Sequence, residues 1–383
     1  MRLLYTFRSL AVWGGIERVL VDKMNYFANM CGYDVYMLTT DQGGHIVPYH
    51  LEDHVHLEDL GIQFYKQYRY SGFRRLWDRW QRTRLFEERL SERIHEIHPD
   101  VIVCTTADPV YSIAKVKGEI PLVVESHSIC SRTIDGENTR QRLVARLLLG
   151  GLKQAVCVVA LTDNDAIEWR RYHPHVEVVP NMAHLNDGQL SSLNNKRVIW
   201  VGRLDYQKRP IEIIKIWQKV YPIFPDWHLD IYGEGEQLQE IENLAHSLNM
   251  NIHIHQPTDR IFDAYRESSI LVSTSLFEPF GLVIPEAMSC GLPVVAYNCP
   301  FGPSSILSDG NDGFLIHNND QQAFADRLCQ LMSDGTLRSQ MGRAASITSR
   351  RFEAKQIMPQ WKTLFEQTSF SQEVIERVFL QKA

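Results

Sequence analysis

At 383 residues the chain is long for a single core, so two domains of ordinary size are expected. Its composition, 44% hydrophobic and 22% charged, is typical of a globular protein, and its net charge of −6 argues against general binding of nucleic acid. The apolar runs fall short of the roughly 18 residues that a membrane-spanning helix needs, so no such helix is predicted.

Short runs rich in β-branched residues alternate with helical patterns along most of the chain. The strand-like runs lie at 2–7, 34–40, 101–106, 122–126, 156–162, 176–180, 197–202, 228–233, 252–256, 270–274 and 293–297. This alternation predicts an α/β protein with buried parallel sheets. A polar stretch rich in Asn and Ser, at 180–197, interrupts it. We therefore expect two Rossmann-like, doubly wound domains facing across a cleft, at 1–183 and 184–365, and a C-terminal helix at 366–383 that could cross back to the first domain.

Residues 65–97 form the basic part of an otherwise acidic protein, and much of the segment has a helical period. Its apolar residues fall largely on one side and its arginines on another; the apolar set is Phe73, Leu76, Trp77, Trp80, Leu90 and Ile94. Arginine interleaved with Trp and Tyr suits a helix lying on an anionic membrane. An amphipathic helix packed on its own domain fits the same pattern.

Two cations lie in the loop that follows the strand at 197–202. Arg203 and Lys208, in the stretch WVGRLDYQKRP, sit at the carboxyl end of that strand, where ligands bind in such sheets. An arginine fork and a lysine point charge could together clamp a diphosphate. Surface charges around a turn are the simpler interpretation of either residue alone.

Two carboxylates, Glu278 and Glu286, lie in the apolar stretch SLFEPFGLVIPEAMSC. A buried strand precedes them, and the amides of Gly281 and Leu282 should open a short helix, which favours an anion. Carboxylates are also good acceptors for paired sugar hydroxyls. The alternative is that Glu286 is an exposed first-turn residue and Glu278 a solvated loop charge.

These motifs resemble the retaining glycosyltransferases of family four, which have the GT-B fold. GRLDYQKRP and EPFGLVIPEAMSCGLPVVA carry the resemblance, with support from GGIER, VVESHS, ALTDND and VVPN. The resemblance implies transfer of a sugar from a nucleotide-sugar donor to a hydroxyl of a glycan or lipid-linked acceptor. It also implies a place in the synthesis of cell-surface polysaccharide, in the cytoplasm and at the inner face of the membrane if residues 65–97 bind there.

The resemblance assigns roles to individual residues. Arg203 and Lys208 would neutralise the departing diphosphate, Glu278 would hold the sugar hydroxyls and Glu286 the ribose. His127, in ESHS, would lie near the reacting carbon and the acceptor. The remaining donor-binding positions are backbone amides or glycines that permit close approach: Gly14, Gly15, Gly202, Gly233, Phe280, Gly281 and Leu282.

No cofactor is expected, because the nucleotide sugar is a substrate and no metal-binding pattern is apparent. His253 and His255 share one face of a strand without a third ligand, and the seven cysteines, an odd number, are expected to be reduced thiols. The stretch YNCPFGPSSIL, at 297–307, resembles that of members using UDP-linked hexoses or N-acetylhexosamines. A non-catalytic nucleotide-sugar-binding protein and a GT-B sugar-nucleotide epimerase remain the alternatives.

Overall fold

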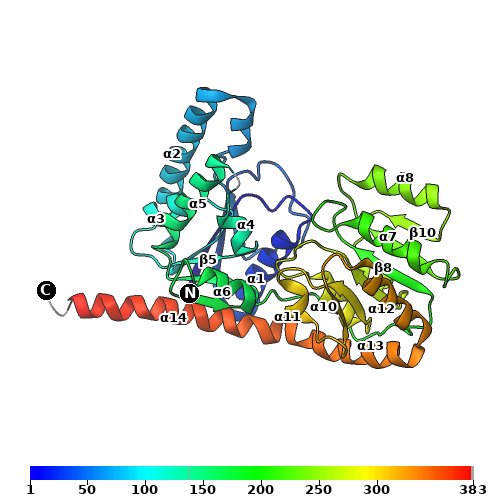
Figure 1. Cartoon of the computed structure of the whole chain (residues 1–383). Coiled ribbons are helices and arrows are strands. Elements are labelled where there is room, and N and C mark those ends of the chain that lie inside the picture. Colours follow the sequence, from blue (N-terminus) through cyan, green and yellow to red (C-terminus); the bar gives the residue numbers. More distant parts are fainter. Residues whose placement is uncertain (137, 381–383) are drawn as a thin grey trace. The chain divides into compact units, whose positions relative to one another are not determined.

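The computed structural model describes residues 1–136 and 138–380, with side chains as far as residue 369. The chain forms two compact units (Figure 1): unit 1 comprises Met1–Val179 with Met358–Ala383, and unit 2 comprises Pro180–Ile357. The sequence placed these divisions at 183/184 and 365/366. The first comes earlier because the Ala183 amide donates to the Phe352 carbonyl at 3.0 Å, within unit 2. Residues 381–383 of the expected C-terminal helix lie outside the described residues.

Unit 1 is built on a seven-stranded parallel sheet in the order β3-β2-β1-β4-β5-β6-β7. The strands are β1 (Arg2–Phe7), β2 (Asp34–Thr39), β3 (Val55–Asp59), β4 (Val101–Thr105), β5 (Leu122–Glu125), β6 (Cys157–Ala160) and β7 (Val176–Val178). The central strands β4, β5 and β6 are buried along their whole length, which explains their continuous apolar runs.

The helical elements of unit 1 are α1 (Gly15–Cys31), η1 (Phe64–Arg69), α2 (Gly72–Ile97), α3 (Val110–Val116), α4 (Cys130–Ile134), α5 (Thr139–Leu152), α6 (Asp163–Trp169) and most of α14 (Ala354–Leu380). Helix α14 begins in unit 2 and continues as part of unit 1 (Figure 1). Its Phe365 is fully buried and packs against Phe27 of α1, with ring centroids 5.3 Å apart.

Unit 2 is built on a six-stranded parallel sheet in the order β10-β9-β8-β11-β12-β13. The strands are β8 (Arg197–Val201), β9 (His228–Tyr232), β10 (Ile252–His255), β11 (Ile270–Ser273), β12 (Val294–Tyr297) and β13 (Gly313–Ile316). The helices are α7 (Pro210–Val220), α8 (Leu238–Leu248), α9 (Ile261–Arg266), α10 (Val283–Ser289), α11 (Gly302–Ile306), α12 (Gln321–Ser333), α13 (Gly335–Ser349) and η2 (Arg350–Phe352). The expected α/β class with two doubly wound parallel sheets is confirmed.

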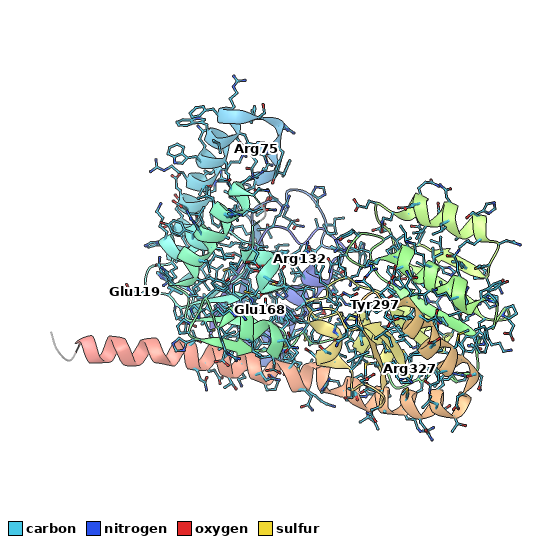
Figure 2. All side chains as sticks on the ribbon, in the orientation of Figure 1. Arg75, Glu119, Arg132, Glu168, Tyr297 and Arg327 are labelled. Atoms are coloured by element: carbon cyan, nitrogen blue, oxygen red, sulfur yellow. The ribbon has the colours of Figure 1, made fainter. Side chains whose placement is uncertain are left out.

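Helix α2 is buried along only part of its length. Phe86, Leu90, Ile94 and Ile97 belong to the core of unit 1, which confirms the amphipathic pattern for the second half of the helix. In the first half the large apolar side chains are exposed: Phe73 (78%), Leu76 (67%), Trp77 (51%) and Trp80 (48%). Figure 2 shows Arg75 at this end of α2, which extends beyond the neighbouring helices of unit 1.

None of the helices in the described ranges combines the length and hydropathy needed to span a bilayer. The seven cysteines are free thiols, and Cys104, Cys130, Cys157, Cys290 and Cys299 are buried.

Candidate active site

The carboxyl ends of β8 and β11 bring two of the predicted site loops together. These strands are neighbours in the sheet of unit 2, and the loops that follow them carry Lys208 and Glu278. Lys208 Nζ forms an ion pair with Glu278 Oε2, and the Ser275 hydroxyl donates to the same oxygen at 3.2 Å. The Thr274 hydroxyl donates to the Lys208 carbonyl at 3.1 Å, so the two loops are fixed to each other.

Glu278 is held by its backbone as well as by its side chain. Its amide donates to the Pro300 carbonyl at 2.6 Å, and the Gly302 amide donates to its carbonyl at 2.7 Å. A Cβ on Gly302 would lie 1.9 Å from the Phe280 carbonyl oxygen, so only glycine permits this approach. The residue is 7% exposed, which rules out the interpretation of Glu278 as a solvated loop charge.

The Phe-Gly turn after Glu278 leads directly into α10. Gly281 has φ +96°, and a Cβ there would lie 2.9 Å from Glu278 Cγ. The helix starts at Val283 with Leu282 as its N-cap, slightly later than the sequence suggested, because Gly281 occupies a conformation outside the helical region. Phe280 is buried and packs edge-on against Phe352, with centroids 5.4 Å apart.

Glu286 lies in the first turn of α10 and is buried, with 5% exposure. The Tyr265 hydroxyl of α9 donates to Glu286 Oε2 at 3.5 Å. The alternative of an exposed first-turn residue is therefore wrong, because the carboxylate is buried and accepts a hydrogen bond from another helix.

The Arg203 side chain is much more exposed than that of Lys208. Its guanidinium, 65% exposed, contacts Asp205 at 3.1 Å and the Gln207 side chain at 3.1 Å. Asp205 also accepts from the Lys208 amide at 2.9 Å, which shapes the loop. Because the Arg203 side chain is itself 65% exposed and both its partners lie in the same loop, its fork can turn to a ligand at small cost.

The glycine positions beside this loop are required by close backbone contact. A Cβ on Gly233 would lie 1.9 Å from the Gly202 carbonyl oxygen, and one on Gly235 would lie 2.5 Å from the Leu204 carbonyl oxygen. The end of β9 is thereby packed directly on the loop after β8.

The candidate site residues of unit 1 lie around α1 and β5. Gly14 is the N-cap of α1 and Gly15 its first residue, and the Tyr49 hydroxyl donates to the Gly14 carbonyl at 3.0 Å. His127, two residues after β5, is 8% exposed. Its Nε2 lies 2.9 Å from Glu125 Oε2, and Lys23 Nζ forms an ion pair with that same oxygen.

Family comparisons cover both units. A model of Glycosyltransferase Family 4 matches residues 13–186, and a model of Glycosyl transferases group 1 matches residues 185–347. The chain belongs to the family-four glycosyltransferases.

Relatives match this glycosyltransferase over different lengths. An uncharacterized glycosyltransferase of Haemophilus influenzae is 29% identical over 91% of this chain and 95% of its own length. The amylovoran biosynthesis glycosyltransferase AmsD of Erwinia amylovora is 29% identical, over 56% of this chain and 62% of that protein. An exopolysaccharide phosphotransferase of Streptomyces coelicolor is 32% identical over half of this chain, and the match spans only 21% of that protein.

Solved structures support the GT-B fold. The Anabaena protein HepE in complex with UDP-glucose superposes with a TM-score of 0.74 at 21% identity, covering 95% of this chain and 99% of that one. The structure of TarM gives a TM-score of 0.76 at 14% identity, over 95% and 98% of the two chains. The expected GT-B architecture of this glycosyltransferase is confirmed.

Lys23, which pairs with the partner of the candidate residue His127, was not identified from the sequence. Lys23 is 2% exposed and lies on the same face of α1 as Val19 and Phe27, four residues to either side. A lysine inside an apolar helical stripe was the available signal, because such a charge needs a buried partner.

His253 and His255 bind within their own sheet. His253 Nε2 lies 3.1 Å from His228 Nδ1, and His255 Nε2 lies 2.9 Å from Asp230 Oδ1. Among the described residues, no group of three or more His, Cys, Asp or Glu side chains is arranged to hold a metal ion.

Proposed function

We propose that this glycosyltransferase transfers a hexose or N-acetylhexosamine from a UDP-sugar to a hydroxyl of a glycan or lipid-linked acceptor, with retention and without a metal. The observation that carries the proposal is the contact between Lys208 and Glu278, which joins a cation and a buried carboxylate at adjacent strand ends. A cation beside a carboxylate suits a nucleotide-sugar donor, because its diphosphate and its sugar are directly bonded to each other.

The proposed roles on the donor follow the chemistry of each group. Lys208, with Arg203, neutralises the diphosphate, and the amides of Phe280, Gly281 and Leu282 face the sugar and phosphate. Glu278 accepts from sugar hydroxyls and Glu286 from the ribose. Gly202 and Gly233 let the backbone approach the nucleotide closely.

Catalysis in this proposal rests on charge rather than on a covalent intermediate. As the bond between the sugar and the diphosphate lengthens, negative charge grows on the leaving oxygen, and a lysine already in place stabilises it. Glu278 is engaged by Lys208 and Ser275, so it is poorly placed to act as the nucleophile of a double displacement. Attack from the same face as the leaving group would then give retention.

Unit 1 contributes the acceptor side of the proposed reaction. Gly15 provides a backbone amide at the start of α1 for the donor phosphates, and His127 serves the reacting carbon and the acceptor hydroxyl. The Gly14 amide donates to the Val12 carbonyl at 2.8 Å, so the role of Gly14 is to permit close approach of the backbone. The choice of UDP-sugar and of polysaccharide synthesis is supported by two similar proteins, HepE in its complex with UDP-glucose and the amylovoran biosynthesis glycosyltransferase AmsD.

The exposed end of α2 supports a lipid-linked acceptor. Beside its four exposed apolar side chains, Arg75 lies over the Tyr68 ring at 4.4 Å and Arg84 lies over the Trp80 ring at 4.9 Å. Arginine and aromatic side chains in contact are suited to the headgroup region of an anionic membrane. We propose that this part of residues 65–97 docks the enzyme on the inner face of the membrane.

A donor panel tests the proposed function. The protein is screened by thermal shift against UDP-, GDP- and ADP-linked hexoses and N-acetylhexosamines, and then assayed for transfer with and without EDTA. One UDP-sugar should give the largest shift, EDTA should not reduce transfer, and NMR of the product should show the anomeric configuration of the donor. Preference for another base, loss of transfer in EDTA, or an inverted product would each refute the corresponding part.

Vesicle sedimentation tests the membrane docking. Trp77→Ser with Trp80→Ser should release the protein from vesicles containing phosphatidylglycerol, while Ile347→Ser, at a more exposed apolar residue of unit 2, should not. Unchanged sedimentation of the double variant would end the idea.

A further inference from the structure

Three buried side chains of unit 1 form a row of contacts that includes the candidate site residue His127. Lys23 of α1 pairs with Glu125 at the end of β5, and Glu125 in turn contacts His127. The side chains are 2%, 2% and 4% exposed, respectively. Lys23 is covered by the Trp361 ring of α14, whose centroid lies 4.0 Å from Nζ. A buried ion pair of this kind is costly, and its retention beside a candidate site residue calls for an explanation.

The charges on the pair are fixed by its surroundings. Burial raises the pKa of Glu125, but the charge of Lys23 and the hydrogen bond from His127 outweigh burial, so the pKa lies below its ordinary value. Burial lowers the pKa of Lys23, and Glu125 partly restores it. The Trp361 face stabilises the ammonium further. Glu125 is therefore a carboxylate at neutral pH, with Lys23 as its counter-charge.

The carboxylate determines which nitrogen of His127 carries the proton. An ionised carboxylate can only accept, so the His127 nitrogen 2.9 Å away, Nε2, must donate. In a neutral imidazole the other nitrogen, Nδ1, is then an acceptor. Lys23 matters because a buried carboxylate without its counter-charge would favour a second proton on the ring, and Nδ1 would become a donor.

We propose that Lys23 and Glu125 are positioning residues that keep His127 neutral with its proton on Nε2, so that Nδ1 accepts a hydrogen bond from a substrate hydroxyl. The inference rests on the proposed function in one respect, the placing of His127 against the donor sugar or the acceptor. It adds that His127 accepts the hydrogen bond in this contact, and that the buried ion pair of Lys23 and Glu125 determines this role.

Other titratable groups face Glu125 and must be considered in any test by pH. They are Tyr5 of β1, Cys104 of β4, Cys157 of β6 and Asp108 in the loop after β4. Burial raises the pKa of all four, and that of Asp108 reaches about 7. Because Asp108 titrates in the working range, pH profiles should be compared in an Asp108→Asn background.

The direct experiment is ¹⁵N NMR of the histidine rings, with the His127 signals assigned by their loss in His127→Asn. The native protein should show the Nε2-protonated neutral tautomer at pH 7.5. In Lys23→Met the same ring should show the doubly protonated pattern. A native ring protonated on Nδ1, or spectra that do not change in Lys23→Met, would overturn the proposal.

Kinetics provide the second readout. In Lys23→Met the acidic limb of the kcat profile should move to higher pH, with turnover recovering toward native in alkaline buffer. A loss that is the same at every pH would indicate a merely structural role and would overturn the proposal. Lys115→Met is the control for loss of a paired lysine, because Lys115, 57% exposed, pairs with Glu87 elsewhere in unit 1.

A second variant keeps the test decisive if Lys23→Met does not fold. Glu125→Gln should give a mixture of ring tautomers and lower kcat about 10-fold or more, as loss of a supporting partner commonly does, with little change in donor KM. An unchanged tautomer would refute the role of Glu125. Since NMR needs no turnover, failure of the proposed transfer reaction would leave the tautomer result intact, and the two failures can be told apart.

Discussion

Replacing Lys208 with methionine removes one charge from the candidate site and keeps most of the side-chain volume. The variant leaves the Glu278 carboxylate, whose side chain is 9% exposed, with a hydrogen bond from Ser275 but without its ion-pair partner. Breaking a fully buried pair costs about 3–5 kcal/mol. Because the Lys208 side chain is 15% exposed, water can reach the site, and we expect a loss of about 2–3 kcal/mol in stability. For a unit of this size that corresponds to a fall in Tm of about 4–12 °C.

The effect on turnover should be larger than the effect on binding. Loss of a preorganised group aimed at developing charge lowers kcat by about 10²–10³-fold. The affinity for UDP should fall less, because Lys208 acts most strongly as the bond to the sugar breaks. The measurements are single-turnover rates, calorimetry with UDP, and Tm.

Two controls separate charge at the leaving group from general damage. Lys215→Met changes an exposed lysine on α7, directly after the site loop, and should leave all three quantities unchanged. Lys208→Met combined with Glu278→Gln should recover stability but not turnover, since the orphaned carboxylate is gone. Equal losses in UDP affinity and kcat for Lys208→Met would refute the leaving-group role.

Three further predictions follow from the described contacts. Glu286→Gln should weaken binding of UDP itself by about 10-fold, the effect of a lost charge-assisted hydrogen bond, while Glu278→Gln should weaken only binding of the intact donor. Calorimetry with both ligands distinguishes the two variants, and equal effects would contradict the division of roles. Gly302→Ala would place a Cβ 1.9 Å from the Phe280 carbonyl oxygen, so it should force the 300–302 loop away from Glu278 and lower Tm. Gly310→Ala, where nothing lies within 4 Å, is the control for the cost of a left-handed φ alone. A Gly302→Ala protein as stable as native would refute the packing argument. Burial raises the pKa of Asp108 from 3.8 to about 7, so the folded state holds a proton that the unfolded state releases. Stability should therefore fall as pH rises between these values, by up to about 1.4 kcal/mol per pH unit. Asp108→Asn should remove that slope in denaturant titrations, and a slope that persists would assign it to another group.

The sequence identified the loops of unit 2 because parallel sheets present their strand ends at one edge. Arg203, Lys208 and Glu278 each follow a strand-like run, so their gathering could be anticipated from order along the chain. The burial of Glu286 could not be anticipated, because its partner Tyr265 lies on another helix, and local spacing fits an exposed carboxylate equally well.

Long-range pairing sets the limit in unit 1. Lys23 and Glu125 are 102 residues apart, and a single sequence gives no reason to join them. The two halves of α2 illustrate the same limit. The amphipathic pattern runs through the whole helix, but only the second half has neighbours that cover its apolar side chains. Periodicity predicts which residues share a face, and tertiary structure decides whether that face is covered.

Helix α14 has a consequence for how the protein is made. The chain enters unit 2 at Pro180 and returns to unit 1 at Met358, so unit 2 is continuous in sequence whereas unit 1 is assembled from both ends of the chain. During synthesis, unit 2 can complete its core while unit 1 still lacks Trp361 and Phe365. The Lys23 ammonium remains without its aromatic cover until Trp361, which follows unit 2 in the sequence, has been translated. A segment translated after the whole of unit 2 therefore completes the core of unit 1.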